Sequence, residues 1–313
     1  MTWHSPNGSG RTTRNGPSTT VDAMGRFRLA PGPFSHHPEI RQVIPHDHCP
    51  QLFDSGSGLP ENSIRSVDDR RPTVVLFDLR SRVIADTEAA GLIESLNKVG
   101  THIWVWTNHP PEPLLSSVLM AASPQTAKAT VFIACMDARV QAALDPLGSS
   151  PQDRLAAVEA FRHANIPVDV AIEPLLPGVT DTNEGLKPLL QAVARLGVTQ
   201  VSVGYLTLPD SERGRVEEAL HELGVLDSVM DAFVEGPVVR ERGEYVRLLP
   251  KPHRHRGYAS AMALAAELGM TLKISSTSNP DFRRTPVEAA DRIRSLQEAF
   301  RSRVRSRVPK SHA

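Results

Sequence analysis

The pattern of hydrophobic and polar positions becomes regular from Pro72 onward. Short runs rich in Val, Ile, Leu and aromatic residues are separated by stretches in which apolar residues recur every three or four positions, as in amphipathic helices. The short runs are apolar at consecutive positions, which is typical of parallel strands covered on both faces. We therefore predict six strands, at residues 73–77, 102–107, 130–135, 168–173, 201–206 and 271–275.

Two of the intervening helices carry clear start signals. Ser150 and Pro151 provide an N-cap followed by a proline at the first helical position. Asp181 and Glu184 have the spacing of a capping box, and Gly197 ends the helix that follows. Strand–helix alternation with crossovers of this length predicts a parallel sheet, either a barrel or a doubly wound sheet. Both architectures place ligands at the carboxyl ends of the strands.

Composition excludes several classes of function. Hydrophobic residues make up 40% of the chain and charged residues 22%, the values of an ordinary globular protein. The formal net charge is zero, so no overall field attracts nucleic acid or a membrane. Local basic stretches at residues 250–256, expected as a loop, and 292–310 leave nucleic-acid contact open. Two cysteines and no apolar leader segment predict a cytoplasmic protein.

The chain divides into three parts by composition. Residues 1–40 are rich in Ser, Thr, Gly, Pro and Arg and show almost no apolar periodicity, so we predict that they are disordered. Residues 41–282 hold the predicted strands and helices and form one domain. Residues 283–313 are predicted to be a basic helical tail.

A series of spaced motifs between residues 134 and 209 resembles the spore photoproduct lyase-like branch of the radical-SAM superfamily. The matching residues are Leu144, Asp145, Pro146, Ser150, Pro151, Arg154, Leu155, Asn165, Ile166, Pro167, Val168, Pro174, Pro177, Gly178 and Asp181. The resemblance extends over about residues 72–282. It implies a parallel, partial (β/α)6 TIM-like barrel of the radical-SAM type.

The same resemblance implies a cluster loop that this sequence does not complete. Members of the family hold a [4Fe–4S] cluster on a C-x-x-x-C-x-x-C loop after the first strand, and the cluster binds S-adenosylmethionine (SAM). The matching segment is IPHDHCPQLF, in which Cys49 takes the middle position. The outer positions then fall on Pro45 and Leu52, which cannot ligate iron. We therefore expect no metal and no [4Fe–4S] cluster, whereas weak SAM binding can persist.

Polar residues at the predicted strand ends are the candidates for a site, because the carboxyl ends of parallel strands converge on one pocket. The candidate ligand-binding residues at strand ends are Asp78, Arg80, Asn108, Glu173 and Tyr205. The resemblance adds Pro177 and Gly178, on the loop that contacts the adenine of SAM in the family. The candidate acid–base residues are His109 and Asp137.

Three functions are compatible with these residues. The first is a radical-SAM-like barrel that binds a ligand or a partner protein, keeps weak SAM binding and carries out no radical chemistry. The second is an enzyme in which strand-end residues perform acid–base chemistry. The third is a radical-SAM enzyme with an unusual cluster, for which His46 or His48 would have to replace a cysteine. The sequence does not identify the substrate or the partner.

Overall fold

The computed structural model describes residues 27–31, 40–45, 74–81, 84–97, 101–121, 126–241 and 243–282. Its main sheet has eight strands in the order β1-β2-β3-β4-β5-β6-β7-β11. The strands are β1 (Phe27–Pro31), β2 (Ile40–Pro45), β3 (Val74–Asp78), β4 (His102–Thr107), β5 (Ala127–Phe132), β6 (Val168–Leu175), β7 (Gln200–Tyr205) and β11 (Thr271–Ile274). Strand β1 is antiparallel to β2, and all the other pairs are parallel.

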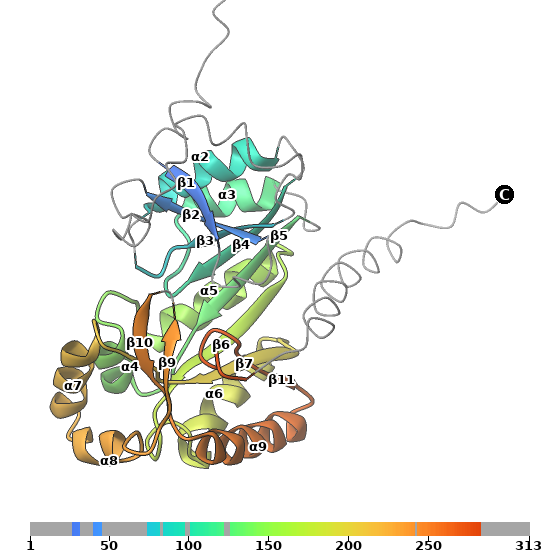
Figure 1. Ribbon diagram of the computed structural model, residues 1–313. Helices are drawn as coiled ribbons and strands as arrows, with labels where there is room; N and C mark the ends of the chain where they lie inside the picture. Colours follow the sequence, from blue (N-terminus) through green and yellow to red (C-terminus); the bar gives the residue numbers. More distant parts are fainter. Residues whose placement is uncertain are drawn as a thin grey trace, which may run out of the picture.

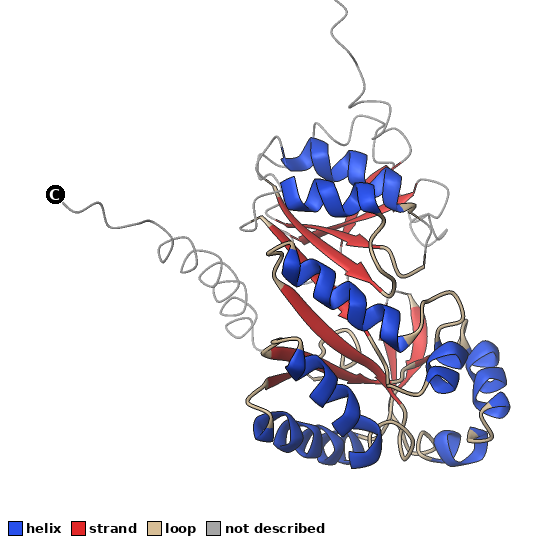
Figure 2. Cartoon of the chain, turned by 180° about the vertical axis from the view of Figure 1, so that it is seen from behind, coloured by secondary structure: helices blue, strands red, loops and turns tan. Residues whose placement is uncertain are grey.

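The parallel strands follow one another in chain order, without the reversal that marks a doubly wound sheet. Right-handed crossovers in one direction place all the connecting helices on the same face. These helices are α2 (Asp86–Asn97), α3 (Pro113–Ala121), α5 (Pro151–His163), α6 (Asn183–Arg195) and α9 (Lys251–Glu267), whereas the short α4 (Ala138–Leu144) precedes α5 at the carboxyl ends of the strands. Figure 2 shows α2, α3 and α5 in front of the sheet. Strands β1 and β11 are the edges of the described sheet, so the architecture is an open, partial barrel, as predicted.

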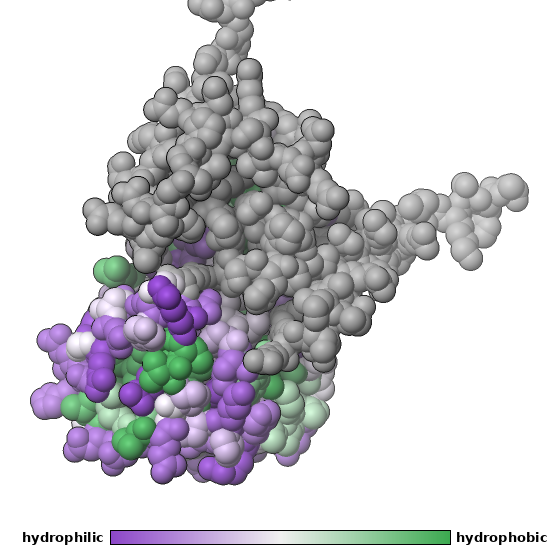
Figure 3. Space-filling model, in the orientation of Figure 1, coloured by the Kyte–Doolittle hydropathy of each residue, from purple (hydrophilic) through white to green (hydrophobic). Residues whose placement is uncertain are grey.

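An insertion of about 45 residues separates β7 from α9. It contains β8 (Leu208–Pro209), α7 (Arg213–Glu222), α8 (Leu226–Asp231), β9 (Val238–Glu241) and β10 (Glu244–Arg247), and its strands form a second sheet in the order β8-β10-β9. In Figure 1 it lies beside the lower end of the main sheet, with α7 and α8 at its outer side. Apolar patches interrupt the hydrophilic surface of this region (Figure 3); Val234, Val238 and Tyr245 are among its exposed residues.

The hydrophobic core lies between the sheet and the helices. The apolar positions of α6 that recur every three or four residues are fully buried there, among them Leu186, Leu190 and Val193. The helix α5 begins as predicted, because the Ser150 hydroxyl accepts a hydrogen bond from the Asp153 amide. Gly197 follows α6 with a φ of +72°, which glycine adopts without strain.

All six predicted strands are present, but three expectations about local structure are wrong. The fifth strand of the sheet begins at Ala127 rather than at residue 130. Its Lys128 and Thr130 point to the inner face, which no described helix covers, and so the strand is apolar on one face only. The cap of α6 is Thr182, whose hydroxyl accepts from the Gly185 amide, and not Asp181.

The third wrong expectation concerns the stretch 250–256, which forms the first turns of α9 instead of a loop. Its Arg254 is 1% exposed and donates to both carboxylate oxygens of Asp281, which explains how a basic residue is accommodated inside the fold. Strands β1 and β2 were not predicted, and β1 lies within the segment expected to be disordered.

Residues 283–313, Cys49 and Leu52 lie outside the described residues, and the domain limits at 40 and 282 stay predictions. Among the helices of the described part, none combines the length and the apolar character that crossing a membrane requires.

Candidate ligand-binding cleft

A cleft of about 340 Å³ lies where the parallel strands end, within the size range of small-molecule sites. One wall comes from the strand ends and the other from α4 and from α7 of the insertion. The lining residues are Arg80, Phe132, Ala143, Leu144, Glu173, Pro174, Tyr205, Leu206, Thr207, Arg215, Val216, Ala219 and Ser278. The guanidinium of Arg139 donates to the carbonyl of Glu222 at 2.6 Å and so ties α4 to α7.

The guanidinium of Arg80 is held in a fixed position at this cleft. Its Nε and Nη2 atoms donate to the two carboxylate oxygens of Asp78, at 2.8 and 2.7 Å. Its Cζ atom lies 4.2 Å from the ring centre of Phe132 and 4.8 Å from that of Trp106, so the cation stacks on aromatic faces. Burial opposes the charge, but the Asp78 carboxylate outweighs it and raises the pKa of Arg80. The side chain remains 35% exposed.

Glu173 is the carboxyl group of the cleft. It is half-buried on β6, and Ser278 donates a hydrogen bond to its Oε2 atom at 2.9 Å. Burial raises the pKa of Glu173, although hydrogen bonds from Ser275 and Ser278 and the charge of Arg80 act in the opposite direction. Gly204 on β7 makes room for this carboxyl, because a Cβ atom there would lie 3.0 Å from the Glu173 Cδ and 2.5 Å from the Ser278 Oγ.

A polar groove runs from Glu173 along the inner face of the sheet. Trp104, Lys128, Asp169 and Glu173 line it with other residues of β4 to β7. Lys128 forms an ion pair with Asp169 on the neighbouring strand, and the indole of Trp104 donates to Thr130 at 2.9 Å. Sequence reasoning missed this groove, because the short runs were interpreted as apolar on both faces.

A buried hydrogen-bond network lies behind Arg80. Asn108 donates from Nδ2 to the carbonyl of Arg80 at 3.0 Å and to the Asp145 carboxylate at 2.7 Å. The His109 ring contacts the Asn108 Oδ1 at 3.0 Å and the Asp86 carboxylate at 3.2 Å. His109 is 7% exposed, and neither it nor Asn108 is among the residues that line the cleft. Their contacts hold the chain that follows β3, and with it Arg80.

Asp137 and Tyr205 make structural contacts, and Tyr205 also lines the cleft. Asp137 caps α4, since its Oδ1 accepts from the amides of Arg139 and Val140. The Tyr205 ring packs against Tyr258, and its hydroxyl donates to the Asp181 carboxylate at 2.7 Å. Burial and this carboxylate raise the pKa of Tyr205.

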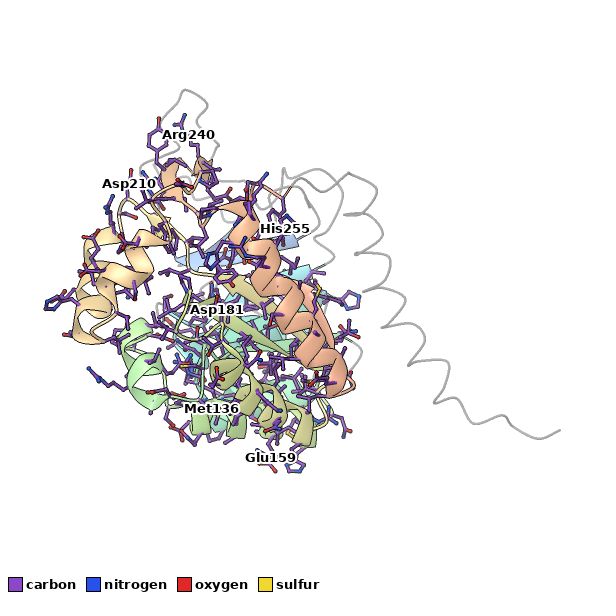
Figure 4. The ribbon with its side chains drawn as sticks, turned by 90° about the horizontal axis from the view of Figure 1, so that it is seen from below. Met136, Glu159, Asp181, Asp210, Arg240 and His255 are labelled. Carbon is purple, nitrogen blue, oxygen red and sulfur yellow. The ribbon has the colours of Figure 1, made fainter. Side chains whose placement is uncertain are left out.

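Asp181 belongs to the loop between β6 and α6 and stabilises it. Its Oδ1 accepts from the Gly178 amide at 2.6 Å, which fixes the loop to β7 through Tyr205. Asp181 lies near the middle of the view in Figure 4, whereas Glu159 and Arg240 lie at its edges. Neither Gly178 nor Pro177 lines the cleft.

Of the candidate residues, the cleft therefore brings together Arg80, Glu173 and Tyr205, with Asp78 as the partner of Arg80. Sequence reasoning missed Phe132, Arg215 and Ser278. Arg215 lies on α7 of the insertion, and no sequence signal places its side chain at the strand ends.

Two mycobacterial proteins resemble part of the chain. Uncharacterized proteins of Mycobacterium tuberculosis (strain H37Rv) and Mycobacterium bovis are each 32% identical over 128 residues, or 40% of this chain. The match covers 37% of each relative, so the chain spans little more than a third of the curated relatives it matches. No protein-family model matches the chain.

Solved structures match over a larger part. Spore photoproduct lyase complexed with a dinucleoside spore photoproduct aligns with a TM-score of 0.50 at 13% identity, covering 68% of this chain and 65% of the lyase. A point mutant of the same lyase aligns with the same TM-score and covers 64% of that chain. A structural similarity at 13% identity supports the fold, but it does not show that the two proteins share an activity. The chain has the partial α/β-barrel fold of spore photoproduct lyase, a radical-SAM protein, as the sequence motifs predicted.

Proposed function

We propose that this chain is a radical-SAM-like barrel that binds a small molecule in the strand-end cleft without radical chemistry, and that SAM is a ligand it still accepts. The observation that carries the proposal is the cysteine content. Three thiolates are needed to hold the family's cluster, and the sequence has two cysteines, Cys49 and Cys135.

The residues present do not fit such a cluster. Cys135 follows β5, is 3% exposed and donates through its Sγ to the Asp137 carbonyl at 3.4 Å. Burial raises the pKa of the Cys135 thiol to about 11, so it stays neutral at pH 7 and is a poor ligand. Pro45 ends β2, the first parallel strand, and cannot ligate iron. These facts leave Cys49 as the single thiol for a site that requires three.

The cleft supports a binding role. It presents a fixed guanidinium, a half-buried carboxyl group and an aromatic face at the position where α/β barrels bind ligands. Pro174, the second-last residue of β6, lines the cleft, so the end of this strand can supply one wall for an adenine. We expect weak affinity, because no iron is present to chelate the amino-acid end of SAM.

Anaerobic reconstitution with iron and sulfide tests the loss of the cluster. We expect substoichiometric iron and no charge-transfer absorbance, both for the wild-type protein and for Cys49→Ala. Stoichiometric iron that disappears on Cys49→Ala would overturn the proposal. A calorimetric titration with S-adenosylhomocysteine (SAH) tests the binding role: saturable heat at one SAH per chain supports it, and no heat at high ligand concentration overturns it.

A second candidate function is acid–base catalysis by Glu173, which its raised pKa favours. The test is incubation of SAM with the protein, followed by chromatography and mass spectrometry of the nucleoside products. Turnover that is lost in Glu173→Gln and kept in Glu217→Gln would favour the enzyme, since Glu217 lies on the exposed side of α7 and pairs with Arg213. Unchanged SAM supports the binding role.

A further inference from the structure

Two of the three charged residues that line the cleft have an ion-pair partner among the described residues, and the third, Glu173, has none. Arg80 is neutralised by Asp78, and Arg215 by Glu212, whose Oε2 lies 2.6 Å from the Arg215 Nη2. Glu173 accepts its hydrogen bonds from serine hydroxyl groups, and no ion pair to it occurs among the described residues. When the partners Asp78 and Glu212 are counted with the lining residues, the charged groups at the cleft sum to −1 whenever Glu173 is ionised.

A half-buried carboxylate without a counter-ion is costly, because burial removes part of its hydration and nothing charged replaces it. Arg80 is the cation whose charge acts on Glu173, but two of its nitrogen atoms are already bonded to Asp78. A positive ligand group placed against Glu173 would replace the missing counter-ion. The raised pKa of Glu173 has the same origin, since the free cleft favours the neutral acid.

The surroundings of Glu173 also suit a cation of low hydration. Phe132 and Glu173 are the two residues that line both the cleft and the inner-face groove, so the Phe132 ring, which Arg80 covers on one face at 4.2 Å, borders the space beside the carboxyl. Trp106 lies edge to face against Phe132, with 5.4 Å between the ring centres. Aromatic faces attract sulfonium and quaternary ammonium groups through their quadrupole.

We propose that the cleft selects ligands with a compact positive charge and binds that charge against Glu173. For SAM, which is the ligand of the proposed function on which this inference rests, the group recognised is the sulfonium. SAH has a neutral thioether at the same position and therefore binds more weakly. An anionic ligand group would instead have to compete with Asp78 and Glu212 for the two guanidinium groups.

The direct test compares three ligands by calorimetry. SAM and sinefungin, which carries an ammonium group in place of the sulfonium, should each bind about tenfold more tightly than SAH. The preference should disappear in Glu173→Gln and be partly kept in Glu173→Asp, which shortens the side chain but retains its charge. Glu217→Gln is the matched control, because it removes a charge from α7 away from the cleft and should leave the preference unchanged.

A ligand without adenosine separates this inference from the proposed function. Tetramethylammonium should change the tryptophan fluorescence in a saturable way in the wild-type protein and not in Glu173→Gln, whereas the neutral isostere tert-butanol should not. Equal affinities for SAM and SAH would overturn the cation preference and leave the binding role intact. Absence of SAM and SAH binding would overturn the SAM proposal. A missing tetramethylammonium response in the wild-type protein would then overturn the cation site itself.

Discussion

Arg154 should be essential for the stability of the strand ends, although it is not among the residues that line the cleft. It is 1% exposed on α5 and donates three hydrogen bonds. Its Nε binds the Ser149 carbonyl at 2.8 Å, its Nη1 binds the Phe132 carbonyl at 2.9 Å, and its Nη2 binds the Asp145 carboxylate at 2.8 Å. Arg154→Met keeps most of the aliphatic stem and removes all three donors.

We expect Arg154→Met to lower the free energy of unfolding by about 3 kcal/mol. Hydrogen bonds to charged groups contribute about 1.5–3 kcal/mol each, but three that share one guanidinium are not additive. Breaking a buried ion pair by removing one partner costs about 3–5 kcal/mol. The Asp145 side chain is 28% exposed, so water solvates it in the variant and reduces the cost. Burial also lowers the pKa of Arg154, and the variant no longer has to desolvate that charge.

Urea unfolding followed by circular dichroism measures this loss. The midpoint should fall by about 1 M or more at an unchanged slope. Arg162→Met is the matched control on the same helix, because Arg162 is exposed and donates one bond, to the Gly197 carbonyl at 2.8 Å. Arg162→Met should lower the free energy of unfolding by no more than about 0.5–1 kcal/mol. If Arg154→Met costs no more than the control, the network around Asp145 does not stabilise the strand ends.

Three further outcomes follow from the same contacts. Gly204→Ala should weaken SAM binding and lower the unfolding temperature, because its Cβ would meet Ser278 and Glu173; an unchanged affinity in calorimetry would show that the carboxyl is placed otherwise. Tyr205→Phe should cost about 1 kcal/mol in urea unfolding by removing the bond to Asp181, and no loss would mean that this bond does not fix the loop. SAM affinity should rise with pH through the raised pKa of Glu173, because the ionised form binds the cation, and Glu173→Gln should abolish this dependence.

The sequence predicted the strands because parallel strands are marked by β-branched and aromatic runs wherever one face is packed by helices. It failed at the start of β5, because the inner face of an open barrel accepts Lys128, which interrupts such a run ahead of the predicted start at residue 130. Strands β1 and β2 escaped prediction because the polar segment around them lacks periodicity. The Asp181 cap was placed one residue early, since Thr182 performs the same hydrogen bonding.

The site was partly predictable for a geometric reason. Strand ends converge in any parallel barrel, so Arg80 and Glu173 could be found from their positions alone. The same rule also selected His109, because it cannot tell a side chain that faces the cleft from one that turns into a buried network. Arg215 and Ser278 come from an insertion and from the segment after β11. Their place in the cleft depends on tertiary packing that no local pattern encodes.

The central claim is that the cleft binds SAM in the absence of an iron–sulfur cluster. The most direct test is a calorimetric titration of SAM into protein that has been treated with a chelator and shown to be free of iron, beside the same protein after reconstitution with iron and sulfide. We predict saturable binding of one SAM per chain with the same affinity in both samples. Heat that appears only after reconstitution, or no heat in either sample, would contradict the claim.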